Sequence, residues 1–385
     1  MSDVDLLSGR ATAEGTRRYA ARFEHLPEHF RSPDRLYLSS LALGTRRGRP
    51  GGVDDLQYRT AVLELVQCGV NVVNTALFDR FQTSERCVGA ALGRAIASGL
   101  VRRDEVVAVT RGGYLTPDAE RARTRDEVRR HLHETYVASG LVDPARVVNG
   151  LYSLEPRLLL HQIERSRANL GLATLDVYCI QEPELHLLAL GPSAFRRQLG
   201  EAFETLERAV SEGRIAAYGL CTWEGLLLPH TERGHLSVLD LFELALDVAG
   251  GDHHLRAIQL PFGLATEEAR GLESQLGMQG RAASVLEVLR DTGTFVMGSA
   301  PLLGGRVLGH VPEAVRDAFP NLTTDAQRCL QFARSTPGIT SAVVGMRDER
   351  HVRENLELLR TPPAAPETLE AIFAGSTADA LERAG

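Results

Sequence analysis

The run VNVVNTALFDRFQTSERCVGAAL, residues 70–92, decides the fold of this 385-residue chain. It opens with β-branched apolar residues, passes through a short polar stretch, and continues with small and apolar residues at helical spacing. β-Branched residues favour strands, whereas apolar residues three and four positions apart favour an amphipathic helix. The run therefore predicts a strand, a loop and a helix, the unit from which a parallel sheet is built.

Seven further strand candidates repeat this pattern, with amphipathic stretches between them. The eight expected strands are 40–44, 70–76, 105–110, 175–181, 215–222, 257–262, 294–300 and 341–346. The expected helices include 58–67, 158–170, 198–212, 282–289 and 326–335. Eight such units predict an α/β fold, a (β/α)8 barrel. A doubly wound sheet is the alternative, but the Gly-Thr-Arg-Arg-Gly-Arg run at 44–49 lacks the GxGxxG spacing of its phosphate loop.

The domain organisation expected is a charged N-terminal arm over residues 1–35 and one barrel domain over residues 36–385. Two stretches exceed a minimal unit, at about 112–157 and 223–252, and both follow the end of an expected strand. Since active sites of such barrels lie at the C-terminal ends of the strands, these long loops are expected to form a lid or a substrate wall.

The composition is that of a soluble, enzyme-sized chain, with 43% hydrophobic residues and a formal net charge of -7. The chain has no lysine, and its arginines are scattered among acidic residues, so no nucleic-acid partner is expected. An odd number of well-separated cysteines without CxxC spacing indicates reduced thiols in the cytoplasm. No long apolar run or signal segment is present, so no membrane partner is expected either, and the sequence indicates no oligomeric state.

Seven motifs in order resemble the aldo-keto reductase family. After residues 70–92 come VVAVTRGGYL at 106–115, LDVYCIQEPE at 175–184, AAYGLCTWEG at 216–225, AIQLPFGLA at 257–265, VMGSAPLLGGRV at 296–307 and STPGITSAVVGMRDERHVRENLEL at 335–358. The resemblance spans about residues 36–360 and implies a (β/α)8 barrel that reduces carbonyl groups with NADP(H).

The catalytic residues of that family do not carry over. The resemblance places its aspartate, tyrosine, lysine and histidine at positions that here hold Asn74, Asp79, Arg111 and Gln181. A guanidinium stays charged at any accessible pH, so a Schiff base and a lysine-tuned tyrosine acid are both excluded. An ionised Asp79 facing Arg111 is expected to accept hydrogen bonds only, with its pKa lowered by the pairing. The alternative is a structural ion pair in a site that has lost its activity.

Other ionisable and aromatic residues fall near the expected strand ends. Glu182, directly after Gln181, is the strongest candidate for acid/base chemistry, although a loop carboxylate exposed to solvent gives the same pattern. His186 and Cys221 are weaker candidates, since each is also expected as an ordinary buried residue. Trp223, the single tryptophan, is expected either to stack on a planar ligand or simply to pack.

The resemblance also implies a cofactor site, in part altered. Gln259 matches the glutamine that binds the nicotinamide carboxamide, and Ser299 stands where many members stack an aromatic residue on the nicotinamide. In the last unit, Arg347 and His351 are expected at the 2′-phosphate. Glu354 and Asn355 are expected at adenine; the alternative is a charged final helix. No spacing of His, Cys or carboxylates indicates a metal.

Three functions follow from this pattern. The first is a barrel enzyme that performs elimination, hydration or cyclisation on a small oxygenated metabolite by acid/base chemistry without redox. The second is an NADPH-dependent carbonyl oxidoreductase with a different proton donor, such as Glu182 or water, and the third is an inactive ligand-binding or scaffold protein. In all three, Asn74, Asp79, Arg111, Gln181 and Glu182 are expected to converge at the C-terminal mouth of the barrel, while the substrate itself is not indicated.

Overall fold

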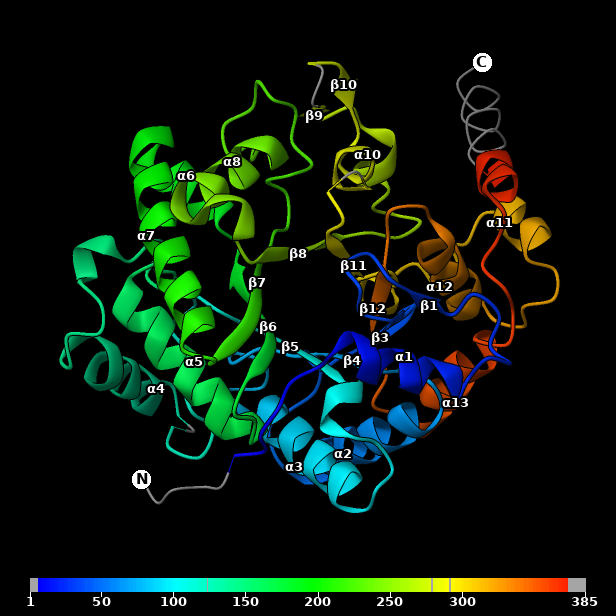
Figure 1. Ribbon diagram of the computed structural model, residues 1–385, viewed down its shortest axis with the longest axis horizontal. Helices are drawn as coiled ribbons and strands as arrows, with labels where there is room; N and C mark the ends of the chain where they lie inside the picture. The colour runs from blue at the N-terminus through cyan, green and yellow to red at the C-terminus, as the bar shows by residue number, and fades with distance from the viewer. Residues whose placement is uncertain (1–5, 123, 278–279, 291, 373–385) are drawn as a thin grey trace.

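The computed structural model describes residues 6–122, 124–277, 280–290 and 292–372 of the chain. Eight parallel strands close a barrel in the order β11-β12-β3-β4-β5-β6-β7-β8 (Figure 1). The barrel strands are β3 (Leu41–Gly44), β4 (Val72–Asn74), β5 (Val107–Gly112), β6 (Leu175–Gln181), β7 (Ile215–Cys221), β8 (Leu255–Pro261), β11 (Phe295–Ser299) and β12 (Ser341–Gly345). All eight predicted strands are confirmed, and the doubly wound alternative is wrong because the described sheet closes without a free edge.

The helices between these strands pack around the outside of the barrel (Figure 1). They are α2 (Gly52–Gln67), α3 (Thr83–Ala97), α5 (Pro156–Leu170), α7 (Pro192–Ser211), α8 (Val238–Ala249), α10 (Val285–Arg290), α12 (Asp325–Ser335) and α13 (Glu349–Leu358). Shorter additions are α4 (Arg125–Leu132), α6 (Glu184–Leu190), α9 (Glu268–Gly271) and α11 (Glu313–Ala318). Side-chain caps fix several starts: the Thr324 hydroxyl accepts from the Gln327 amide and so begins α12.

One predicted helix is shorter than expected. The helix predicted at 282–289 begins only at Val285, because Ala282–Ala283 (β10) pairs antiparallel with Gln275–Leu276 (β9). Ser284 and Glu287 then exchange hydrogen bonds between side chain and backbone at the helix start. This reciprocal cap satisfies two amides that have no partner inside the helix, so the boundary falls there.

The N-terminal segment folds against the barrel instead of extending from it. It holds α1 (Ala13–Ala21) and an antiparallel pair, β1 (Phe30–Arg31) with β2 (Leu38–Ser39). The buried Tyr19 donates its hydroxyl hydrogen bond to the Val66 carbonyl at 2.6 Å, and the Ala11 amide donates to Asp176 at 2.7 Å. Val66 lies in the last turn of α2, and Asp176 lies at the N-terminal end of β6, so this segment covers the end opposite the expected site.

Strand residues alternate between two apolar layers. Odd and even positions separate into a cluster inside the barrel and a larger one between strands and helices. Val107 and Val109 of β5 belong to the inner cluster and Ala108 to the outer one. The inner side chains, mostly valine, alanine and cysteine, fill the barrel, so any cavity lies above them at its mouth.

Candidate functional site

The strand alternation carries six side chains to the mouth of the barrel. Each stands two positions after an inner-cluster residue or belongs to that cluster itself, and so faces inward. The six are Asn74 on β4, Arg111 on β5, Gln181 on β6, Cys221 on β7, Gln259 on β8 and Ser299 on β11. All six line one cavity of about 900 Å³. The expected convergence at the mouth therefore holds for Asn74, Arg111 and Gln181.

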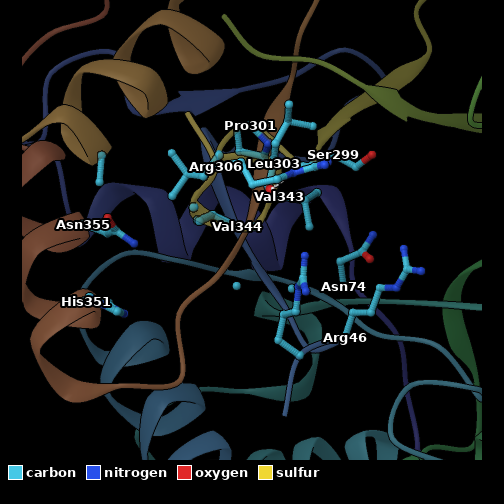
Figure 2. Close-up of a pocket in the computed structure, with 18 of the residues that line it drawn as sticks. Arg46, Asn74, Ser299, Pro301, Leu303, Arg306, Val343, Val344, His351 and Asn355 are labelled. Carbon is cyan, nitrogen blue, oxygen red and sulfur yellow. Dashed lines mark hydrogen bonds between the residues drawn. The ribbon is translucent and has the colours of Figure 1, made fainter. Parts of the chain in front are cut away.

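The cavity is elongated and reaches from the barrel mouth to helix α13. Figure 2 shows Arg46 and Asn74 on one side of it and His351 and Asn355 on the other, with Leu303 between them. One end is thus formed by strand ends at the barrel axis. The other end lies against the first turns of α13, beyond the barrel rim.

Asn74 and Gln259 are paired across the base of this cavity. The Asn74 side-chain amide donates to the Gln259 side-chain carbonyl at 2.8 Å and lies 3.2 Å from the Met297 sulfur. Because its oxygen accepts this bond, the Gln259 amide group keeps its two N–H donors for other partners. The pair fixes the orientation of Gln259 from below.

Arg111 is held from three sides in the wall of the cavity. Its Nε donates to the Thr75 carbonyl at 3.3 Å, its Nη1 lies 3.3 Å from the Cys221 sulfur, and its guanidinium lies 5.5 Å from the centre of the Phe78 ring. The guanidinium has five N–H donors, and these contacts use only some of them. A nearly buried cation therefore presents free donors to the cavity.

Asp79 does not line the cavity and behaves differently from the sequence prediction. Its side chain is fully buried, accepts from the Thr45 hydroxyl at 3.0 Å, and lies 3.9 Å from Arg111 Nη2. Burial raises the pKa of Asp79 more strongly than the attraction of Arg111 lowers it. The predicted lowering was wrong because desolvation outweighs a contact at this distance, and Thr45 stands between this carboxyl and the cavity.

Glu182 is presented to the cavity by two hydrogen bonds. The Gln181 amide donates to one carboxylate oxygen at 2.7 Å, and the Tyr152 hydroxyl donates to the other at 3.0 Å. The backbone of Glu182 has φ of 47°, in the left-handed region that non-glycine residues seldom adopt. Such strain persists only where the surrounding contacts impose it, and it is commonest at functional sites.

Two other predicted residues, Cys221 and Trp223, line the cavity, whereas His186 does not. His186 is fully buried in α6, and neither ring nitrogen has a hydrogen-bond partner within the described residues. Burial lowers the pKa of His186 to about 4. The prediction that His186 binds substrate is therefore wrong, because the side chain is buried in the core beside the barrel mouth.

This buried histidine predicts a pH-dependent stability. The unfolded chain takes up a proton near pH 6.5 and the folded chain only near pH 4, so His186 destabilises the fold as pH falls through this window. Replacing His186 with Leu should stabilise the protein relative to the parent by about 2 kcal/mol more at pH 5 than at pH 7. Urea unfolding of both proteins at the two pH values measures this, and an equal difference at both would contradict the burial of a neutral imidazole.

The far end of the cavity holds the four residues predicted for the adenosine part of a cofactor. Arg347, His351, Glu354 and Asn355 all line it. Arg347 is also engaged by Asp54 at 3.0 Å and Gln57 at 3.2 Å. Its charge is thus partly neutralised, which the sequence did not indicate.

Sequence reasoning missed two walls of the cavity. Arg46 and Arg47 in the loop after β3 line it, as does the loop from Ala300 to Gly309 after β11. The arginine run at 44–49 and the paired glycines of LLGGRV were the available signals. The loop expected to form a lid at 112–157 supplies none of the described lining residues, although its Tyr152 hydroxyl donates to Glu182. The second loop, at 223–252, contributes Trp223 to the lining.

Among the described residues, no group of His, Cys, Asp or Glu is arranged to hold a metal ion. A search of the same residues found no helix long and apolar enough to cross a membrane.

Comparisons with known proteins agree with this architecture. The model of the aldo/keto reductase family matches residues 40–226. An aldo/keto reductase from Klebsiella pneumoniae, solved with NADP and acetate, has a TM-score of 0.58 at 19% identity, covering 90% of this chain and 94% of its own. The holo form of an aldo-keto reductase from Bacillus halodurans gives 0.58 at 16% identity, with 88% and 93% covered. No curated protein sequence matches the chain.

The closed barrel, with its cavity at the strand ends, defines the fold class of these reductases. Residues 40–226 of the chain match the aldo/keto reductase family, and the described barrel has the fold of these reductases.

Proposed function

We propose that this protein is an NADP(H)-dependent carbonyl oxidoreductase with an altered reactive centre formed by Arg111, Gln181 and Glu182. The observation that carries the proposal is that one elongated cavity is lined both by these residues and by the polar residues of α13. A cavity confined to the barrel mouth would serve acid/base chemistry on a small molecule. The part of the cavity that extends beyond the barrel rim to α13 would be filled by the adenosine end of a dinucleotide.

The residues along the cavity fit a dinucleotide in charge and in size. Its volume of about 900 Å³ lies within the range of cofactor pockets. Arg46 and Arg47 line it, and their guanidinium groups make no hydrogen bond within the described residues. Arg306 adds a third charge, and within the described part of the chain its guanidinium donates only to the Leu303 carbonyl. These arginines would neutralise phosphates, and the free amide donors of Gln259 would meet a carboxamide.

The chemistry of the centre would divide between the cofactor and the protein. Bound NADPH supplies the reducing equivalents. Arg111 would donate to the carbonyl oxygen of the substrate and stabilise the negative charge that develops there. Glu182, held by Gln181 and Tyr152, would exchange the proton: it returns one to that oxygen on reduction and removes it on oxidation.

Replacing Gln259 with Leu should weaken NADPH binding about tenfold, since the carboxamide of the cofactor loses the Gln259 amide donors at little change in side-chain volume. Isothermal calorimetry measures the affinity of parent and variant. A Gln198→Leu variant on α7, outside the cavity, is the matched control and should bind like the parent. Undetectable binding of NADPH to the parent would refute the oxidoreductase proposal.

The second candidate is acid/base chemistry without redox, the function that the sequence favoured. It is supported by the replaced positions: Asp79 is hydrogen-bonded to Thr45 and does not line the cavity, so it offers the substrate no acid where the resemblance places the tyrosine of the family. The calorimetric result separates the two candidates. An inactive ligand-binding protein would bind small molecules but would catalyse neither NADPH-dependent reduction nor a non-redox reaction.

We further propose a cytoplasmic protein that acts on a small molecule, without nucleic-acid or membrane partners. All five cysteines are free thiols, which suits a reducing compartment.

A further inference from the structure

A second cavity, of about 760 Å³, adjoins the first at the mouth of the barrel. Four residues, Arg46, Arg47, Glu182 and Trp223, line both cavities, so the two spaces meet at these side chains. The remaining walls of the second cavity come from α6, from the loop after β7 and from Gly48 in the loop after β3. A molecule whose reacting group lies at Arg111 would therefore direct its remote part toward Glu182, Trp223 and this second space.

The turn that carries Trp223 is held by hydrogen bonds of its backbone. The side chain is 40% exposed, yet its backbone amide donates to the buried Glu184 carboxylate at 2.6 Å. The same oxygen lies 3.3 Å from the Glu224 amide. A Cβ added at Gly225 would stand 2.8 Å from the Glu184 Cβ, so the turn closes tightly on this carboxylate. The buried Glu184 carboxyl thus accepts hydrogen bonds from this turn and holds the turn in which Trp223 is exposed.

Charges of both signs surround the second cavity. Arg46 and Arg47 stand among its walls together with Glu182 and Glu224, and all four line it. A ligand with a permanent negative charge would be repelled by the carboxylates, and a ligand with a permanent positive charge would be repelled by the guanidinium groups. A neutral ligand with hydroxyl groups suits both, because each hydroxyl donates to a carboxylate or accepts from an arginine.

The apolar part of the wall completes the pattern. Leu185, Leu188 and Leu228 line the cavity, and Leu188 is 42% exposed. An exposed indole beside exposed leucine offers a flat surface on which a ring can stack. Polar groups at the edge and an apolar face together select a ring that carries hydroxyl groups around its rim.

We propose that the second cavity is a binding site for a neutral, hydroxyl-bearing ring, which forms the part of the substrate remote from the reacting carbonyl. The inference about the remote part rests on the proposed function, whereas ring binding itself does not require the cofactor. Trp223 would provide the stacking face, and Glu224 with Arg46 would bind the hydroxyls.

Trp223 is the only tryptophan of the chain, so its fluorescence reports directly on this site. The probe is methyl β-glucoside, titrated at millimolar concentrations into the protein without NADPH, with calorimetry as the second measurement. We expect a saturable change in the emission of the parent, and because a Trp223→Ala variant has no tryptophan to report, its weaker binding is measured by calorimetry. Cyclohexylmethanol, gluconate and glucosamine are the comparison ligands, and each should bind more weakly than the glucoside.

The variant Glu224→Ala should weaken glucoside binding about fivefold, the effect of one lost hydrogen bond at an exposed site. Glu232→Ala, an exposed glutamate of the same loop that does not line the cavity, should leave it unchanged. No binding of the glucoside by either method would overturn the proposal, as would tighter binding of gluconate or glucosamine. Because no step uses NADPH, a failure here is independent of the calorimetric test of the cofactor.

Discussion

Replacing Arg111 with Met should reduce substrate affinity or kcat/KM by about 2–5 kcal/mol, the range for truncating a desolvated charged hydrogen-bond partner. Arg111 lines the cavity with its side chain only 9% exposed, and its contacts to Thr75 and Cys221 leave donors free. A charge placed there binds a carbonyl or anionic oxygen strongly because little water competes with it. The measurement is kcat/KM for an activated aldehyde with NADPH, together with urea unfolding of parent and variant.

The buried partner of Arg111 requires a control. Removing the guanidinium leaves the Asp79 carboxyl, already short of hydrogen bonds, in the core. An uncompensated buried charge costs about 3–5 kcal/mol, unless the carboxyl becomes protonated. The double variant Arg111→Met/Asp79→Asn removes that cost and isolates ligand binding. If Arg111→Met loses mainly stability and keeps its affinity and kcat/KM, Arg111 and Asp79 form a structural pair, and the site centres on Glu182 and Trp223.

The fold could be predicted because strand and helix periods are local properties of the sequence. In β5, the same alternation that buries Val107 and Val109 also points Arg111 inward, so the mouth residues followed from the strands. Asp79 lies after β4 in a turn, where no period applies. Its orientation toward Thr45 depends on contacts between distant segments, and these a single sequence does not reveal.

The same reasoning explains the other differences. His186 and Glu184 occupy a short helix whose buried face is set by α7 and the loop after β7. The pairing of Arg347 with Asp54 joins residues 293 positions apart in the chain. Loops that form cavity walls, such as the one beginning at Ala300, follow from tertiary packing, and only their glycines marked them in advance.

Restoring the family residues together, as Asn74→Asp, Asp79→Tyr, Arg111→Lys and Gln181→His, should raise NADPH-dependent aldehyde reduction by about 100-fold or more. A positioned general acid contributes about 10²–10⁴-fold, and no tyrosine lines the cavity among the described residues of the parent. A lysine can lower the pKa of a tyrosine from about 10 toward the working pH, whereas the present Asp79 is shielded by Thr45. Consumption of NADPH in the presence of the aldehyde gives the rate.

Two features decide how this result is interpreted. A tyrosine at position 79 exceeds the space of a fully buried aspartate, and overpacking costs about 1–3 kcal/mol, so unfolding and NADPH affinity are measured alongside. The matched control is Asn74→Asp/Arg111→Lys/Gln181→His, which restores the cation but leaves Asp79 and should stay near the parent rate. If the unaltered parent already reduces the aldehyde at ordinary enzymatic rates, the residues at positions 74, 79, 111 and 181 have not abolished proton delivery to the substrate. In that event Glu182 or a water held by it already delivers the proton, and Glu182→Gln rather than the restored tyrosine would change the rate.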